Sequence, residues 1–167
     1  DKKQPGYEFL ATATDTRGGY SPMGIFDGID NNNTGSWRSG NTTYPKFVFI
    51  DLQKDTYLVN RIYVVGAVYP SPIGFNKTIE LFWGMEPFTD AKLGDANYAS
   101  LPAFANAKAA GNYMWAQNQW AGGFHGVDAK FSFTNVRYAC VVFLDYRSGT
   151  NNITEAYVYG YDTAAEE

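Results

Sequence analysis

Hydrophobic and polar residues alternate with a period of two in several short stretches of the chain. Ile79, Leu81 and Trp83 fall on one face of one stretch, and Phe131 and Phe133 fall on one face of another. Such alternation is typical of a half-buried β-strand, because successive side chains of a strand point to opposite faces. Both stretches are therefore predicted to be antiparallel strands, with these residues facing the core.

Further stretches are rich in β-branched and aromatic residues but alternate less clearly. They cover residues 9–14, 47–52, 60–65, 138–145 and 153–161. Weak alternation is expected for central strands that are packed on both faces. About seven short strands separated by Gly, Pro and Asn clusters, without long helical periodicity, favour an all-β antiparallel sandwich over a parallel α/β sheet.

Two segments depart from the strand pattern. Residues 21–26 are expected to form one helical turn, and residues 87–111 are interpreted as an insertion in the sandwich. Ser100 is predicted to cap a short Ala-rich helix that ends at Ala110, with Gly111 as its terminator.

Length and composition indicate one folded domain. The chain has 167 residues, of which 45% are hydrophobic and 18% charged. We treat residues 1–167 as a single domain with its core at about 7–162, compatible with one module of a longer protein. Its lone cysteine, Cys140, is interpreted as a small buried hydrophobe.

The charge balance and the aromatic content limit the classes of molecule that the chain is expected to bind. A net charge of −4 argues against duplex nucleic acid as a partner and disfavours a membrane surface. Aromatic residues make up 17% of the chain, more than one core needs, so some are expected at the surface. Exposed Tyr and Trp side chains suit the binding of sugars or peptides.

Catalytic patterns are missing from the sequence. His125 is the only histidine, no Gly-x-Ser-x-Gly pattern surrounds a serine, and no Gly-rich phosphate-binding motif occurs. The carboxylates show no pairing that marks a glycosidase cleft. The sequence therefore predicts a protein that is not an enzyme.

Four motifs occur in order along the chain. They are Asp27-Gly28 shortly before Trp37, the apolar run 47–52 that ends in Asp-Leu, the pair Arg137-Tyr138, and the closing run 153–160, Ile-Thr-Glu-Ala-Tyr-Val-Tyr-Gly. This pattern resembles the discoidin domain, also called the coagulation-factor C-type domain, of the galactose-binding-like group. The resemblance covers about residues 9–161 and implies a jelly-roll β-sandwich.

Some positions differ from that family pattern. Gln53 stands where the family usually has Gly, and the 87–111 insertion replaces a short turn. The cysteine pair of the animal discoidin domains is missing. The missing pair favours the bacterial carbohydrate-binding modules over the blood proteins as the nearest branch.

The segment 27–34 is dense in oxygen donors, which suits a hard cation such as Ca²⁺. It does not match an EF-hand, because position twelve of such a loop would be Asn41 instead of Glu. The resemblance implies a structural calcium site formed by Asp27, Asp30, Thr34 and Glu155. The alternative is a solvated polar turn, with Glu155 paired to Arg137.

The loops between the predicted strands are rich in aromatic, Arg and Asn residues. Sugars pack their C–H faces on rings and exchange hydrogen bonds through their hydroxyls, so both kinds of group are needed. Trp37 and Trp83 are expected in the core. The candidate ligand-binding residues are Arg17, Tyr20, Arg38, Tyr69, Asn76, Trp115, Trp120, His125, Arg147 and Asn152.

Two functional classes follow. The first is a non-catalytic carbohydrate-binding module that binds a glycan or polysaccharide through loops at one end of the sandwich, next to an attached or neighbouring enzyme domain. The second is an adhesion or protein-interaction domain on the same fold. Either is expected to be secreted or on a cell surface, including lipid-anchored on a bacterium; this sequence contains no signal peptide, which leaves secretion open.

Overall fold

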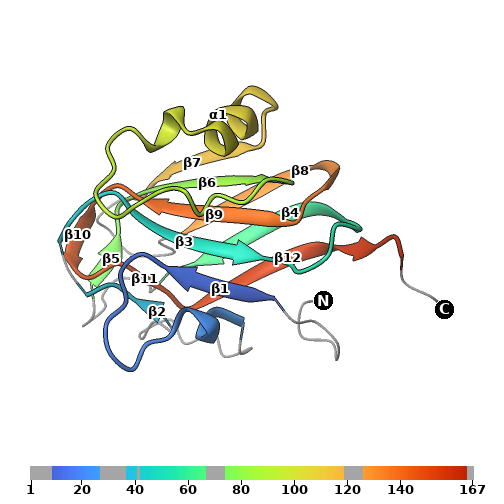
Figure 1. Cartoon of the computed structure of the whole chain (residues 1–167). Coiled ribbons are helices and arrows are strands. Elements are labelled where there is room, and N and C mark those ends of the chain that lie inside the picture. Colours follow the sequence, from blue (N-terminus) through green and yellow to red (C-terminus); the bar gives the residue numbers. More distant parts are fainter. Residues whose placement is uncertain (1–8, 27–36, 41, 67–73, 119–125, 165–167) are drawn as a thin grey trace.

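The strands of the computed structural model lie in two layers that pack face to face (Figure 1). The structure describes residues 9–26, 37–40, 42–66, 74–118 and 126–164. In chain order, the elements are β1 (Leu10–Ala13), η1 (Pro22–Phe26), β2 (Trp37–Arg38), β3 (Lys46–Asp51), β4 (Tyr57–Val65), β5 (Gly74–Asn76), β6 (Thr78–Gly84), η2 (Tyr98–Ser100), α1 (Pro102–Ala109), β7 (Tyr113–Gln117), β8 (Val127–Asn135), β9 (Tyr138–Phe143), β10 (Tyr146–Gly149), β11 (Asn152–Ile153) and β12 (Glu155–Asp162).

All strand pairs in the described part of the chain are antiparallel. One layer is a five-stranded sheet in the order β1-β3-β9-β6-β7, and the other is a three-stranded sheet in the order β12-β4-β8. The short pairs β10-β5 and β11-β2 lie together at one end of the sandwich (Figure 1). This arrangement confirms the predicted antiparallel β-sandwich with a short helical insertion.

The main hydrophobic core lies between the two sheets. Val48 and Val141 face it from the five-stranded sheet, and Ile62 and Val158 face it from the three-stranded sheet. Trp37 is fully buried there, with its ring stacked 5.3 Å from that of Phe143. Trp83, also buried, stacks on Phe131 of β8 and so joins the two sheets. Trp37 and Trp83 therefore occupy the core, as predicted.

A second hydrophobic cluster covers the outer face of the five-stranded sheet. Phe47 and Phe82 point outward from the sheet and meet Phe88, Tyr98 and Phe104 of the insertion. The centre of the Phe104 ring lies 5.0 Å from that of Phe82 and 4.9 Å from that of Phe88, both in the edge-on geometry that aromatic rings prefer. Burial on both faces explains why the sequences of β3 and β9 alternate only weakly.

A buried carboxylate fastens the insertion to the sheet. Glu80 of β6 is 7% exposed and accepts hydrogen bonds from the hydroxyls of Tyr98 and Tyr113, one on each carboxylate oxygen. Burial, together with these bonds, raises the pKa of both tyrosines. The carboxylate is thereby satisfied in a place where an unpaired charge would be costly.

Two local predictions need correction, and the structure also shows the backbone conformation of Gln53. Ser100 does not cap α1: it ends η2, and the helix begins at Pro102 after Leu101. Phe133 is 53% exposed, because a register shift of β8 against β4 interrupts the alternation on which the inward prediction rested. Gln53 has a φ of 73°, the left-handed conformation that favours the Gly usual in the resembling family.

No helix in the described part of the chain has the length and apolarity needed to span a membrane.

We expect Phe104→Ala to lower the free energy of unfolding by about 3–5 kcal/mol, because the truncation leaves a cavity in the second cluster. The exposed Asn106→Ala on the same helix is the control and should change it by less than about 1 kcal/mol. Urea unfolding measures both. Equal effects of the two variants would show that the cluster does not stabilise the domain.

Candidate functional site

The end of the sandwich that carries β2, β5, β10 and β11 brings together segments far apart in the sequence. β11 pairs with β2 through Ile153 and Trp37, and β10 pairs with β5 through Tyr146 and Asn76. The loop after β1 joins them, because the backbone N–H of Arg17 donates to the carbonyl of Arg38. We call this region the loop end.

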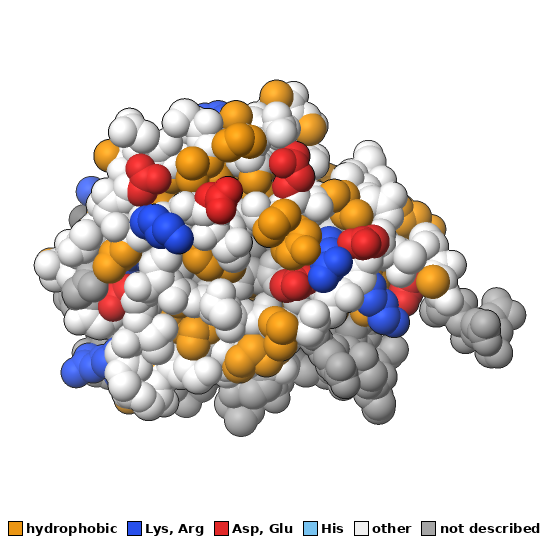
Figure 2. All heavy atoms as spheres, viewed as in Figure 1, with side chains coloured by type: hydrophobic (Ala, Val, Ile, Leu, Met, Phe, Trp, Pro, Cys, Tyr) orange, Lys and Arg blue, Asp and Glu red, His pale blue; other side chains and the backbone are white. Residues whose placement is uncertain are grey.

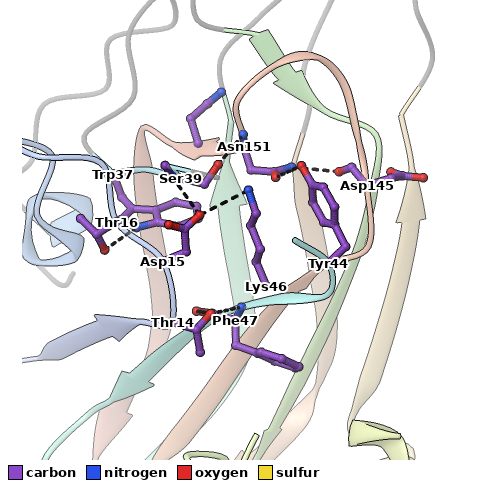
Figure 3. Close-up of polar contacts among 12 residues, drawn as sticks. Thr14, Asp15, Thr16, Trp37, Ser39, Tyr44, Lys46, Phe47, Asp145 and Asn151 are labelled. Atoms are coloured by element: carbon purple, nitrogen blue, oxygen red, sulfur yellow. Dashed lines mark hydrogen bonds and ion pairs between the residues drawn. The ribbon is translucent and has the colours of Figure 1, made fainter. Parts of the chain in front are cut away.

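Buried amide side chains hold these segments in place. Asn76 is 1% exposed; its amide nitrogen donates to the carbonyl of Asn152, and its amide oxygen accepts from the backbone N–H of Asn152. The fully buried Asn151 donates to the Asn76 amide oxygen and to the carbonyl of Asp145. Asn151 and Ser39 also exchange hydrogen bonds at 3.0 Å (Figure 3). Asn76 and Asn152 thus connect β5 to β11 through hydrogen bonds. Their role in ligand contact stays a prediction.

A lysine lies inside this network. The side chain of Lys46 is 0% exposed, and its ammonium lies 3.4 Å from the Asp15 carboxylate and 4.6 Å from the centre of the Tyr44 ring (Figure 3). Burial lowers the pKa of Lys46, and Asp15 opposes that shift. Asp15 also accepts from the backbone N–H of Gly40 at 2.9 Å. The ion pair therefore ties the loop after β1 to the start of β3.

Two tyrosines extend from the network to the surface. The hydroxyl of Tyr44 donates to the amide oxygen of Asn151 at 2.8 Å, and burial raises its pKa. Its ring stacks on that of Tyr146, with centroids 5.8 Å apart. Tyr146 is 38% exposed, so it presents ring area to solvent. Sequence reasoning missed this ring, because Tyr146 directly follows a stretch interpreted as one long strand.

Arg38 and Tyr20 are in contact at the loop end. The guanidinium carbon of Arg38 lies 4.1 Å from the centre of the Tyr20 ring, in cation–π geometry. The Arg38 Nε is buried and has no hydrogen-bond partner in the described part of the chain. Tyr20 and the exposed Arg17 line an open hollow of about 580 Å³ between β1 and η1. The structure therefore brings together three of the ten predicted ligand-binding residues.

The other predicted residues are placed differently. Trp115 is 51% exposed on the edge strand β7, opposite Glu80 of β6 and on the same side as Tyr113. It therefore lies on the outer face of the five-stranded sheet. Tyr69, Trp120, His125 and the side chain of Arg147 lie outside the described residues.

The structure describes only one of the four predicted calcium ligands. Glu155 is fully buried at the start of β12, whereas Asp27, Asp30 and Thr34 lie outside the described residues. Arg137, the alternative partner of Glu155, pairs with Asp51 and Asp55. The described ranges contain no cluster of three or more His, Cys, Asp or Glu residues suited to a metal ion.

No known family profile and no curated protein matches the sequence. Solved structures do match. One is a family 32 carbohydrate-binding module of NanJ from Clostridium perfringens in complex with galactose: 17% identity, 90% of this chain and 92% of that chain, TM-score 0.59. A fucose-binding module from Streptococcus pneumoniae shares 14% identity over 95% of this chain and 99% of its own, with a TM-score of 0.59. A fucolectin from Morone saxatilis serum shares 18% identity over 94% of this chain and 49% of its own, with a TM-score of 0.61. These likenesses confirm the predicted discoidin-like, galactose-binding-like fold.

Lys46→Met should destabilise the domain by about 3 kcal/mol, because it removes the ammonium that lies 3.4 Å from the poorly solvated Asp15 carboxylate. For a domain of this size, that corresponds to a fall in Tm of roughly 6–12 °C. The matched control is Lys54→Met, since Lys54 makes an exposed ion pair with Asp162 at 3.0 Å, a type that contributes little. Thermal unfolding compares them, and similar Tm values for the two variants would contradict the prediction.

Proposed function

We propose that this protein is a non-catalytic carbohydrate-binding module that binds a glycan at the loop end. The observation that carries the proposal is the Arg38–Tyr20 pair, in which a guanidinium stacks on a ring beside an open hollow and its buried Nε has no hydrogen-bond partner among the described residues. Buried donors are normally satisfied, so an unsatisfied one at a hollow suggests that a ligand completes it.

The chemistry of the loop end suits a sugar. Ring area on Tyr20 and Tyr146 can pack against sugar C–H groups, while Arg17 and Arg38 donate to hydroxyl oxygens. The buried ion pair of Lys46 and the asparagine network hold these groups in place before a ligand arrives, which lowers the entropic cost of binding. The galactose-bound and fucose-binding modules on the same fold support this assignment.

The proposal includes an extracellular location, secreted or on a cell surface, where glycans are abundant, and an attached or neighbouring enzyme as the source of catalysis. A shallow site that buries one or two sugar units should bind weakly, with a Kd in the millimolar to high micromolar range, about −4 to −6 kcal/mol. Adhesion to a protein partner is the competing function.

Arg38→Met should reduce the affinity for the best monosaccharide at least tenfold, about 1.4 kcal/mol, because it keeps the apolar stem and removes the hydrogen-bond donors. Arg61→Met is the matched control: Arg61 also stacks on tyrosines, 4.9 Å from Tyr63 and from Tyr159, but it lies on the three-stranded sheet and is paired with Asp128. Calorimetry with galactose, fucose and N-acetylglucosamine measures the affinities.

Product analysis after long incubation accompanies the calorimetry. Unchanged affinity of Arg38→Met would remove the site from the loop end, and released sugar would contradict the non-catalytic assignment. If no glycan of a broad panel binds and a protein partner does bind, the adhesion function is favoured.

We also propose that Glu155 is one ligand of a structural Ca²⁺ ion, with Asp27, Asp30 and Thr34 as the others. The support is the full burial of the Glu155 carboxylate and the strand pairing: Trp37, three positions after Thr34, pairs with Ile153, two positions before Glu155. An ion at this place would link the segment before β2 to the start of β12.

Addition of EGTA should then lower the Tm by roughly 5–10 °C, since calcium at a hundredfold excess over its Kd contributes about 2.7 kcal/mol. Glu155→Gln should lose this response. Glu80→Gln, a buried carboxylate outside the proposed site, should keep it. A chelator response that is absent from the wild type, or retained in Glu155→Gln, would argue against the ion.

A further inference from the structure

A groove of about 310 Å³ lies on the outer face of the five-stranded sheet, between β1 and the first residues of the insertion. Its walls come from Leu10 and Thr12 of β1, from β3, and from Pro87 to Thr89. Thr12 also lines the hollow beside Tyr20. We propose that the groove is a second subsite, which takes further units of a neutral oligosaccharide whose first unit occupies the loop end. This inference rests on the proposed function.

The floor of the groove is aromatic. Phe49 and Tyr138 are half-buried, pack on the second hydrophobic cluster and line the groove. The Arg137 guanidinium lies 5.0 Å from the centre of the Tyr138 ring and braces it. Leu10, 43% exposed, adds apolar area at the edge. Figure 2 shows hydrophobic side chains gathered on this side of the molecule below the insertion, with acidic and basic side chains beside them.

Residues with polar side chains also line the groove. Thr12, Thr89 and Tyr138 carry hydroxyls, and none of these three side chains makes a hydrogen bond to a described residue. Asp51 contributes an acceptor: its Oδ1 receives the backbone N–H of Gln53 and the Nε of Arg137, which leaves Oδ2 available. Hydroxyls both donate and accept, so this set matches a polyhydroxylated ligand better than a purely apolar one.

Size and charge define the occupant further. A volume near 310 Å³ is at the small end of ligand sites, whereas a protein partner would need a much larger surface. Asp51, Asp55 and Arg137 together carry one net negative charge, so an acidic sugar is disfavoured. The geometry therefore suits neutral sugar units that continue from the loop end past Thr12.

The test compares galactose and N-acetylglucosamine with the neutral β-1,4-linked oligosaccharides of two to six units built from each. Calorimetry gives the affinity as a function of chain length, and backbone amide NMR shifts of Phe49, Thr89 and Tyr138, which line the groove and not the loop-end hollow, report on the groove. Thr89→Trp fills the groove from an exposed position, and Ser132→Trp, an exposed position on β8, is the matched control.

We expect the longer chains to bind about tenfold more tightly than the monosaccharide and to shift the groove amides. Thr89→Trp should remove this gain and leave monosaccharide affinity unchanged, whereas Ser132→Trp should alter neither. Affinity independent of chain length, or groove amides that never shift, overturns the second subsite and leaves the loop-end site intact. If the groove amides shift and the amides around Arg38 do not, the result supports a sugar site in the groove and overturns the proposed function. If no amide shifts in the groove or around Arg38, both the second subsite and the proposed function are overturned.

Discussion

Polar groups removed from water must find partners, and the loop end is organised by this requirement. Asn76 and Asn151 are buried where strands from distant parts of the chain meet, and each amide bridges segments that have no sheet in common. Lys46, buried among them, requires Asp15. An unpaired buried amide costs about 1–3 kcal/mol and a broken buried ion pair about 3–5 kcal/mol, a large share of a domain stability of about 5–15 kcal/mol. The segments therefore have little freedom to separate. Among the described residues, the buried Nε of Arg38 lacks a hydrogen-bond partner, in contrast to these paired groups.

The insertion determines which part of the outer face of the five-stranded sheet is exposed. It covers part of the outer face of the five-stranded sheet with an aromatic cluster, and Glu80 fastens it through two tyrosine hydroxyls. Where the insertion leaves the sheet uncovered, Phe49 and Tyr138 form the floor of the groove next to β1. The same segment therefore stabilises the sheet and builds one wall of the proposed second subsite, so changes in the insertion should affect both stability and chain-length preference.

The two proposed subsites meet at Thr12, at the edge of the five-stranded sheet. A single shallow site binds a sugar weakly, because most hydroxyls stay in water and each net hydrogen bond contributes little. A second subsite that holds a connected unit adds binding free energy without paying again the full entropic cost of association. A module with this layout gains affinity for chains over single sugars, and the size of the gain depends on how well the linkage fits the path between the subsites.

Local pattern determined the layers of the fold, because strand periodicity and burial depend on neighbouring residues: Ile79, Leu81 and Trp83 face the core as predicted. The same reasoning failed at Phe133, where a shift in strand register, a property of the pair β4-β8, reversed the side chain. The sequence by itself determined the sandwich, the insertion and the kinds of residue in the loops. Only the tertiary structure decided which of them meet: that Arg38 stacks on Tyr20, that Trp115 lies on an outer sheet face, and that Lys46 is buried beside Asp15 at the loop end. Such contacts join positions that are distant in the chain, and no local pattern records them.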